Sequence, residues 1–315
     1  MIESEPGAAG AMIARSRRRP ASGGLGIVDR IAEGVLVVAL VGELALVLAN
    51  VAARVFFNSS FLWADEVAHL DLSVLAFIGG AVAYRRREHA SVRVLLNLLP
   101  APVERRCRAL ADVLVLFATG ITAVASLQFI ASNWAERTPI LQLPAALIAL
   151  PLPLGLALLA LYAVIELQRQ HGAAAWRILV GFAVVMLAAA ATRDMWLTWF
   201  AGDTAIVATL ALFFVAIFAG VPVGFVLLLS TAAYLWIANA GPMVVLPQTM
   251  VNGTGNFILL AIPFFILAGL IMERGGISVR LVRFIQALVG HYRGGLLQVT
   301  VASMYLVSGL SGSKP

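Results

Sequence analysis

Residues 28–56 read VDRIAEGVLVVALVGELALVLANVAARVF, a run of 29 residues whose centre is almost entirely aliphatic. A helix crosses the hydrocarbon core of a bilayer with about 20 apolar residues, so this run is long enough to span it. Comparable runs recur along the chain of 315 residues, which is 61% hydrophobic and 12% charged, with a mean hydropathy of +0.96. Water cannot be the solvent for most of such a surface, so the sequence predicts an all-α, polytopic membrane protein.

Apolar stretches separated by polar breaks predict a series of membrane helices. The expected spans are 28–56, 62–84, 106–133, 142–168, 176–195, 204–219, 221–239, 256–273 and an apolar segment from 295. Gly220 joins two of them tightly, with Pro222 just inside the second helix, where its missing N–H costs least. The segment 278–291 is short and amphipathic.

Arginines are concentrated on one side of these spans. A cytoplasmic N-terminus assigns eighteen arginines to the inside and leaves Arg54, Arg137 and Arg193 outside. By the positive-inside rule, this asymmetry predicts that orientation. It also accounts for the net charge of +6 without a nucleic-acid partner. Residues 88–100 are too short to span, and their apolar side chains share one helical face, so we expect an arm along the inner membrane surface.

Four of the acidic side chains in the first two expected spans are candidates for a specific role. Glu43 is near the middle of the first span, and Asp71 is about two turns inside the second. Charges at that depth are costly and face a partner or a wet cavity, so either packing against an interfacial arginine or a proton or ion path fits them. Asp65 and Glu66 follow Trp63 at the start of the second span, where the positive end of the helix dipole favours acids. A helix anchor and a functional role both fit this second pair.

The sequence predicts no bound cofactor. Glu66 and His69 form an E-x-x-H pair, but a di-iron bundle needs two such pairs, and the four histidines fall in separate segments. Cys107 is the only cysteine, so neither a disulfide framework nor a thiolate metal site is available. The chain also has no Walker motif for ATP.

The last sixty residues carry a specific pattern, NFILLAIPFFILAGLIMERGGISVRLVRFIQALVGHYRGGLLQVTVASMYLVSGLSGSKP. It resembles the large membrane subunit of the tripartite ATP-independent periplasmic (TRAP) transporters, through AIPFFILAG, M-x-x-G-G-I-S, LVG-x-x-x-GGL and SG-x-SGS in the same order and spacing. The first 170 residues resemble that family's small membrane subunit, through RVFFNSSFLWADE at 54–66 and FIGGAVAYRRREH at 77–89.

The resemblance implies a division of the chain into four parts. These are a cytoplasmic polar tail at 1–26, a four-span small-subunit scaffold at 27–170 with the arm 88–100, a connecting span at 171–200, and the start of an elevator-type large subunit at 201–315 that ends in one leg of a re-entrant hairpin. The connecting span fixes the topology, because four spans return the chain to the cytoplasm and the large subunit must begin outside. The family's motif continues past SGS, whereas Lys314 and Pro315 are last here. We therefore expect either a truncated coding sequence or a separate polypeptide for the rest of the large subunit.

The resemblance also implies a sodium and substrate site at the hairpin tip, formed by Ser311, Gly312 and Ser313, with Ser308 and Gly309 beside them. A Ser/Gly break at membrane depth exposes backbone oxygens, which is tolerated where they line a cavity or bind an ion. Small side chains let a hard cation approach those oxygens closely. The alternative interpretation is close helix packing by small residues.

Three further residues would support this site. Pro263 and Gly269 would shape the span that packs against the hairpin, and a kink alone is the simpler role for them. Asn252 would lie on the outer side, near the mouth.

The resulting functional hypothesis is a component of a sodium-gradient-driven importer in the bacterial inner membrane. A periplasmic binding protein would deliver an organic acid, sodium would be the coupling ion, and the chain would not be an enzyme. Two alternatives remain open. One is a non-transporting scaffold or truncated fragment. The other is an intramembrane serine protease, suggested by G-x-S-G at 309–312, which needs a histidine on a later span to activate the serine.

Overall fold

The computed structural model describes residues 25–91, 100–172, 174–200, 202–292 and 294–311. Its helices are α2 (Leu25–Phe57), α3 (Ala64–Arg86), α4 (Ala101–Asn133), α5 (Ala146–Ala149), α6 (Pro151–His171), α7 (Ala174–Ala191), α8 (Arg193–Trp199), α9 (Asp203–Phe218), α10 (Val223–Ile237), α11 (Val245–Thr254), α12 (Phe257–Arg274), α13 (Ile277–Val289) and α14 (Gly295–Ser311). Within these ranges the only β feature is one isolated bridge between Arg137 and Pro144. The all-α prediction is confirmed.

Membrane-spanning length is reached by four of these helices, over Gly26–Phe57, Ala64–Arg86, Cys107–Asn133 and Ala146–Gln170. Two bent pairs add up to two more spans, because α7 and α8 meet at 66° and α11 and α12 at 47°. Helices α9, α10 and α14 are apolar but shorter. The described part of the chain is therefore a polytopic helical membrane protein, as the hydropathy predicts.

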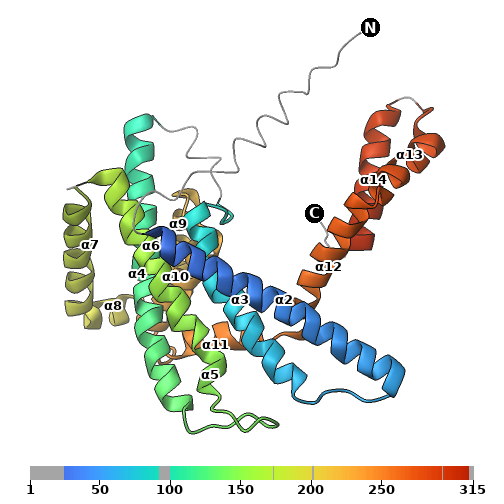
Figure 1. Cartoon of the computed structure of the whole chain (residues 1–315). Helices are drawn as coiled ribbons and strands as arrows, with labels where there is room; N and C mark the ends of the chain where they lie inside the picture. Colours follow the sequence, from blue (N-terminus) through green and yellow to red (C-terminus); the bar gives the residue numbers. More distant parts are fainter. Residues whose placement is uncertain (1–24, 92–99, 173, 201, 293, 312–315) are drawn as a thin grey trace.

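Helices α2, α3, α4 and α6 pack into one bundle, and α12, α13 and α14 extend away from it (Figure 1). Two threonine hydroxyls inside the bundle are satisfied within their own helix. On α4, the hydroxyls of Thr119 and Thr122 donate to the carbonyls of Val115 and Ala118 in the preceding turn. Such bonds let polar residues face other helices without leaving unpaired groups in a medium that cannot hydrogen-bond them.

The part of the chain that resembles the small subunit and the part that resembles the large subunit share one buried core. Buried residues from the bundle and from the α9–α10 hairpin form a single cluster, which comprises Ala81, Ala111, Val115, Leu159, Tyr162, Ala216, Val221, Phe225 and Val226. Beside it, Tyr84, His89 and Phe225 form what we call the aromatic joint. The His89 ring stacks on Phe225 at 5.4 Å between centroids, and Tyr84 meets Phe225 edge-on at 5.8 Å. The Val223 N–H donates to the Ala90 carbonyl at 3.0 Å, which fastens the same two segments.

The aromatic joint should weaken in acid. Burial lowers the pKa of the His89 imidazole from its ordinary value, so the folded state binds a proton less readily than the unfolded state. The contribution of His89 to stability is therefore fully present above about pH 6.5, and it is lost as the pH falls below that value and through the lower pKa of the folded state. Unfolding in detergent between pH 5 and pH 8 checks this, with His89→Phe as a variant that keeps the ring but cannot titrate. Parallel pH profiles for the two proteins would contradict the expectation.

Several predicted boundaries differ from the structure. The expected span 142–168 begins later, because residues 134–145 form a connection in which the Thr138 N–H donates to the Leu143 carbonyl. Pro222 stands immediately before α10 as its N-cap rather than inside the helix. Helix α11 was not predicted. The expected arm falls largely on residues 92–99, outside the described residues, as does the tail up to residue 24.

Candidate functional site

The predicted sodium site lies at the end of α14. The backbone of Ser308, Gly309 and Ser311 is helical, as part of Gly295–Ser311. Gly312 and Ser313 lie outside the described residues. The SG-x-SGS segment therefore begins in the last turn of α14, and α14 packs against α13 and against α12, the helix that carries Pro263.

Helix α12 has two of the predicted supporting residues. Its start is fixed by Asn256, whose side-chain oxygen accepts a hydrogen bond from the Ile258 N–H at 3.1 Å. Pro263 lies inside the helix. A Cβ placed on Gly269 would meet nothing within 4 Å, so this glycine is not required by a close contact with the described residues.

The two acids at membrane depth face one another across α2 and α3. Glu43 is completely buried, and neither of its carboxylate oxygens has a hydrogen-bond partner among the described residues. Asp71 points at the backbone of α2, since a Cβ placed on Gly42 would lie 3.7 Å from its Oδ2. The charges of Glu43 and Asp71 are close enough to interact. This arrangement is costly unless a cation, a proton or a further polar group offsets it.

This acidic pair lies beside a contact between the two parts of the chain. Leu72, adjacent to Asp71, packs with Ala68 and with Leu260 of α12 in one buried cluster that Leu46 of α2 also touches. The hydroxyls of Ser73 and Thr254 lie 3.3 Å apart across the same contact. The structure therefore places Glu43 and Asp71 near α12. Whether they serve packing or an ion path stays a prediction.

Replacing Glu43 by methionine should stabilise the fold. The methionine side chain is similar in size and has no carboxylate to bury, so we expect the free energy of unfolding to rise by about 1–3 kcal/mol. Denaturant unfolding in detergent measures this. Glu33→Met on the same helix is the matched control. Glu33 forms a half-exposed ion pair with Arg86 at 2.6 Å, and its loss should lower stability by about 0–1 kcal/mol. A loss of stability in Glu43→Met would show that an unseen partner satisfies this carboxylate.

The other two predicted acids separate in the structure. Asp65 is exposed. Glu66 instead accepts hydrogen bonds from the backbone N–H groups of Ile140 and Leu141, at 2.7 and 3.0 Å. Glu66 therefore holds the 134–145 connection against the start of α3. Backbone donors leave no pattern in a sequence, so this role could not be read from it.

Asn252 lines a cavity of about 440 Å³ between the two parts of the chain. His69, Asn133 and Glu136 come from the bundle, and Asn252 and Thr254 come from α11. The cavity lies at the end of the bundle that carries the α4–α5 connection. If the N-terminus is cytoplasmic, this is the outer end, where the sequence analysis expects Asn252. The cavity was not predicted, because its residues come from four separate segments.

Comparison with known proteins gives two family matches on this one chain. Residues 43–173 match the family described as "Tripartite ATP-independent periplasmic transporters, DctQ component". Residues 210–315 match "Tripartite ATP-independent periplasmic transporter, DctM component". The two matches follow one another in the order expected for joined small and large components.

Individual relatives agree with these matches. The sialic acid TRAP transporter permease protein SiaT of Haemophilus influenzae is 26% identical over 305 residues, which cover 89% of this chain and 47% of that protein. The isethionate TRAP transporter permease protein DctMQ of Oleidesulfovibrio alaskensis is 27% identical over 81% of this chain and 40% of its own length. The 2,3-diketo-L-gulonate large permease protein YiaN of Escherichia coli is 46% identical over 94 residues, 22% of its length. The chain thus spans less than half the length of these curated relatives.

Proposed function

Because the chain belongs to the tripartite ATP-independent periplasmic transporter family, with small and large membrane components joined in one polypeptide, we propose that it is a membrane permease component of a secondary importer of an organic acid. The observation that carries this proposal is the succession of both component families on one chain. Sialic acid, isethionate and C4-dicarboxylates, named for the relatives, are all organic anions. The relatives are permeases, and we propose transport rather than an enzymatic reaction.

Sodium is the proposed coupling ion. A helix end rich in serine and glycine at membrane depth offers carbonyl and hydroxyl oxygens to a small cation. In this proposal Ser311, Gly312 and Ser313 bind sodium and the substrate carboxylate, with Ser308 and Gly309 close by. Helices α12 and α14 would move as part of an elevator domain against the scaffold of α2, α3, α4 and α6. The extension of α12–α14 away from the bundle is compatible with such a division (Figure 1).

The proposed location is the inner membrane of a bacterium, with the N-terminus in the cytoplasm. Arg85, Arg87, Arg108 and Arg169 gather at one end of the bundle, which supports that end as the cytoplasmic one. A periplasmic binding protein would then dock at the opposite end, over the α4–α5 connection, and release its organic acid there. The division into a tail, a scaffold at 27–170, a connecting segment at 171–200 and a large-component segment from 201 remains part of this proposal.

Reconstituted uptake tests this function. Proteoliposomes would hold this chain, alone and together with the remaining segment of the large component that its relatives have. Labelled sialic acid, isethionate or a C4-dicarboxylate would be presented with and without the cognate binding protein. We expect uptake of one of these anion classes only with the binding protein. Failure of all of them, with the complete large component present, would favour the non-transporting scaffold.

A further inference from the structure

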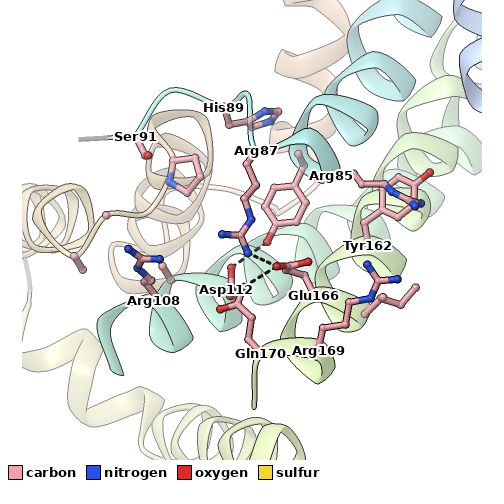
Figure 2. A pocket seen from close by; sticks show the side chains of 16 residues that line it. Arg85, Arg87, His89, Ser91, Arg108, Asp112, Tyr162, Glu166, Arg169 and Gln170 are labelled. Atoms are coloured by element: carbon pink, nitrogen blue, oxygen red, sulfur yellow. Dashed lines mark hydrogen bonds and ion pairs between the residues drawn. The ribbon is translucent and has the colours of Figure 1, made fainter. Parts of the chain in front are cut away.

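A small cavity of about 120 Å³ lies at the arginine-rich end of the bundle, between the ends of α3 and α6, the first turns of α4 and the α9–α10 turn. Four arginines from three helices line it, and we call it the basic cavity. They are Arg85, Arg87, Arg108 and Arg169. Figure 2 shows Arg87 reaching into its centre above Glu166, with Arg108 and Arg169 on opposite sides. None of the proposed transport chemistry uses this cavity.

Two acids, Asp112 and Glu166, line the same cavity, so its lining holds two carboxylates and four guanidinium groups. Arg85 forms an ion pair with Asp29 and lies 5.0 Å above the Tyr162 ring, so it is a wall of the cavity rather than a free donor. Arg108 pairs with Glu104, which does not line the cavity. The remaining charged groups of the lining are Arg87, Arg169, Glu166 and Asp112. The Tyr84 hydroxyl donates to Asp112 at 3.3 Å.

Two guanidinium groups share one carboxylate on the α6 side. Arg87 pairs with Glu166, which also accepts a hydrogen bond from Gln170 at 2.8 Å. Arg169 is exposed and forms no hydrogen bond or ion pair with another described residue, although its charge interacts with Glu166. A guanidinium has five N–H donors, so Arg87 and Arg169 together have more donors than the oxygens of Glu166 and Asp112 can accept, since each of these acids already accepts a hydrogen bond from another residue. The arrangement suits an additional anion with several oxygens.

The backbone at Arg87 strengthens this interpretation. Arg87 is the C-cap of α3 and has φ 57° and ψ 34°, the left-handed conformation in which glycine is the usual residue. An arginine at this position carries conformational strain that glycine would not. Its side chain is about half exposed, at 49%, and is directed toward the cavity. The strained position thus presents a guanidinium where the fold alone would favour glycine.

The position of the basic cavity along the membrane-spanning helices indicates which kind of anion it would bind. The cavity lies where the membrane-spanning helices α3 and α6 end, at Arg86 and His171, which is the level of lipid headgroups. Arginines bind phosphate oxygens through two parallel N–H bonds, and basic pockets between spans at a membrane surface suit anionic lipid headgroups. We propose that the basic cavity binds a phosphate group, carried by an anionic phospholipid or free in solution, through Arg87 and Arg169.

Two variants separate this role from a purely structural one. Arg87→Gly removes the cation and relieves the left-handed strain, so the unfolding temperature of the delipidated protein should stay within about 2 °C of the parent value. Arg169→Gln removes an arginine that forms no hydrogen bond or ion pair with another described residue, and it should be equally mild. The matched control is Arg86→Gln, because Arg86 is adjacent, half-exposed and paired with Glu33, and does not line the cavity.

The experiment adds phosphatidylglycerol, cardiolipin, phosphatidylcholine or inorganic phosphate to the delipidated full chain in detergent, and records unfolding temperature and lipid retention by native mass spectrometry. We expect an anionic lipid to raise the unfolding temperature of the parent and of Arg86→Gln by about 3 °C or more, and Arg87→Gly and Arg169→Gln to lose most of that shift. An equal, arginine-dependent effect of inorganic phosphate would identify free phosphate as the ligand. No shift, or a shift that both cavity variants retain, would overturn the proposal.

Discussion

A methyl group added at Gly155 is expected to destabilise the bundle by about 3 kcal/mol. Gly155 is buried on α6 against α3, and a Cβ there would lie 2.5 Å from the carbonyl oxygen of Phe77 and 2.8 Å from its Cβ. The carbonyl oxygen is a backbone atom and the Cβ is bonded directly to the backbone, so rotation of the Phe77 side chain relieves neither contact. The contact between α3 and α6 is the most extensive helix pair of the bundle, and Gly155→Ala would have to push these helices apart.

Unfolding in detergent micelles measures this effect, with Gly120→Ala as the matched control. Gly120 lies inside α4, and a Cβ there would meet nothing within 4 Å. That substitution should be neutral or stabilising by up to about 1 kcal/mol, because alanine favours the helix over glycine. Equal stability of Gly155→Ala and the parent would mean that α3 and α6 do not approach as closely as the structure places them.

The second large effect is expected at the predicted sodium site. Ser311→Ala and Ser313→Ala each remove a hydroxyl that the proposed function assigns to the ion or to the substrate carboxylate. A hydrogen bond or ligand contact to a charged group is worth about 1.5–3 kcal/mol, so the sodium concentration for half-maximal uptake should rise roughly 10-fold to 100-fold. Ser308→Ala should have a smaller effect, since that residue lies one turn earlier on α14.

Ser303→Ala on the same helix is the control for these variants. Ser303 is buried, and its hydroxyl has no hydrogen-bond partner among the described residues. We expect its removal to leave the sodium dependence of uptake unchanged. If Ser311→Ala and Ser313→Ala behave like Ser303→Ala, the serines act only as small residues that allow close helix packing, and the ion site lies elsewhere.

Much of the fold could be predicted because lipid imposes a strong and simple constraint. The run at 28–56 corresponds to α2, and the runs at 204–219 and 256–273 correspond to α9 and α12 within a few residues. Helix α11 was missed, since its ten residues include Pro247, Gln248 and Asn252 and have neither the length nor the apolar character of a span. The predicted span at 142–168 includes the last four residues of the 134–145 connection, among them the apolar Leu143, which the structure leaves exposed.

Less of the candidate sites than of the fold could be predicted from the sequence. Glu43 and Asp71 could be singled out because a charge at membrane depth is unusual in any single span. Their mutual proximity depends on how α2 and α3 pack, which the spacing within each helix does not determine. The aromatic joint brings His89 together with Phe225, 136 positions later, and the basic cavity combines residues of α3, α4 and α6. Contacts of this kind arise from tertiary packing and have no local pattern.

In the proposed function, this chain is part of a transporter driven by a sodium gradient. The most direct measurement is uptake of the identified organic acid into proteoliposomes that contain this chain, the remaining large component and the cognate binding protein, without ATP, under an inward sodium gradient. We predict accumulation of the acid above its external concentration, which collapses when sodium is equal on both sides or replaced by potassium. Accumulation of the same size under all three conditions would contradict sodium coupling and the assignment of Ser311 and Ser313.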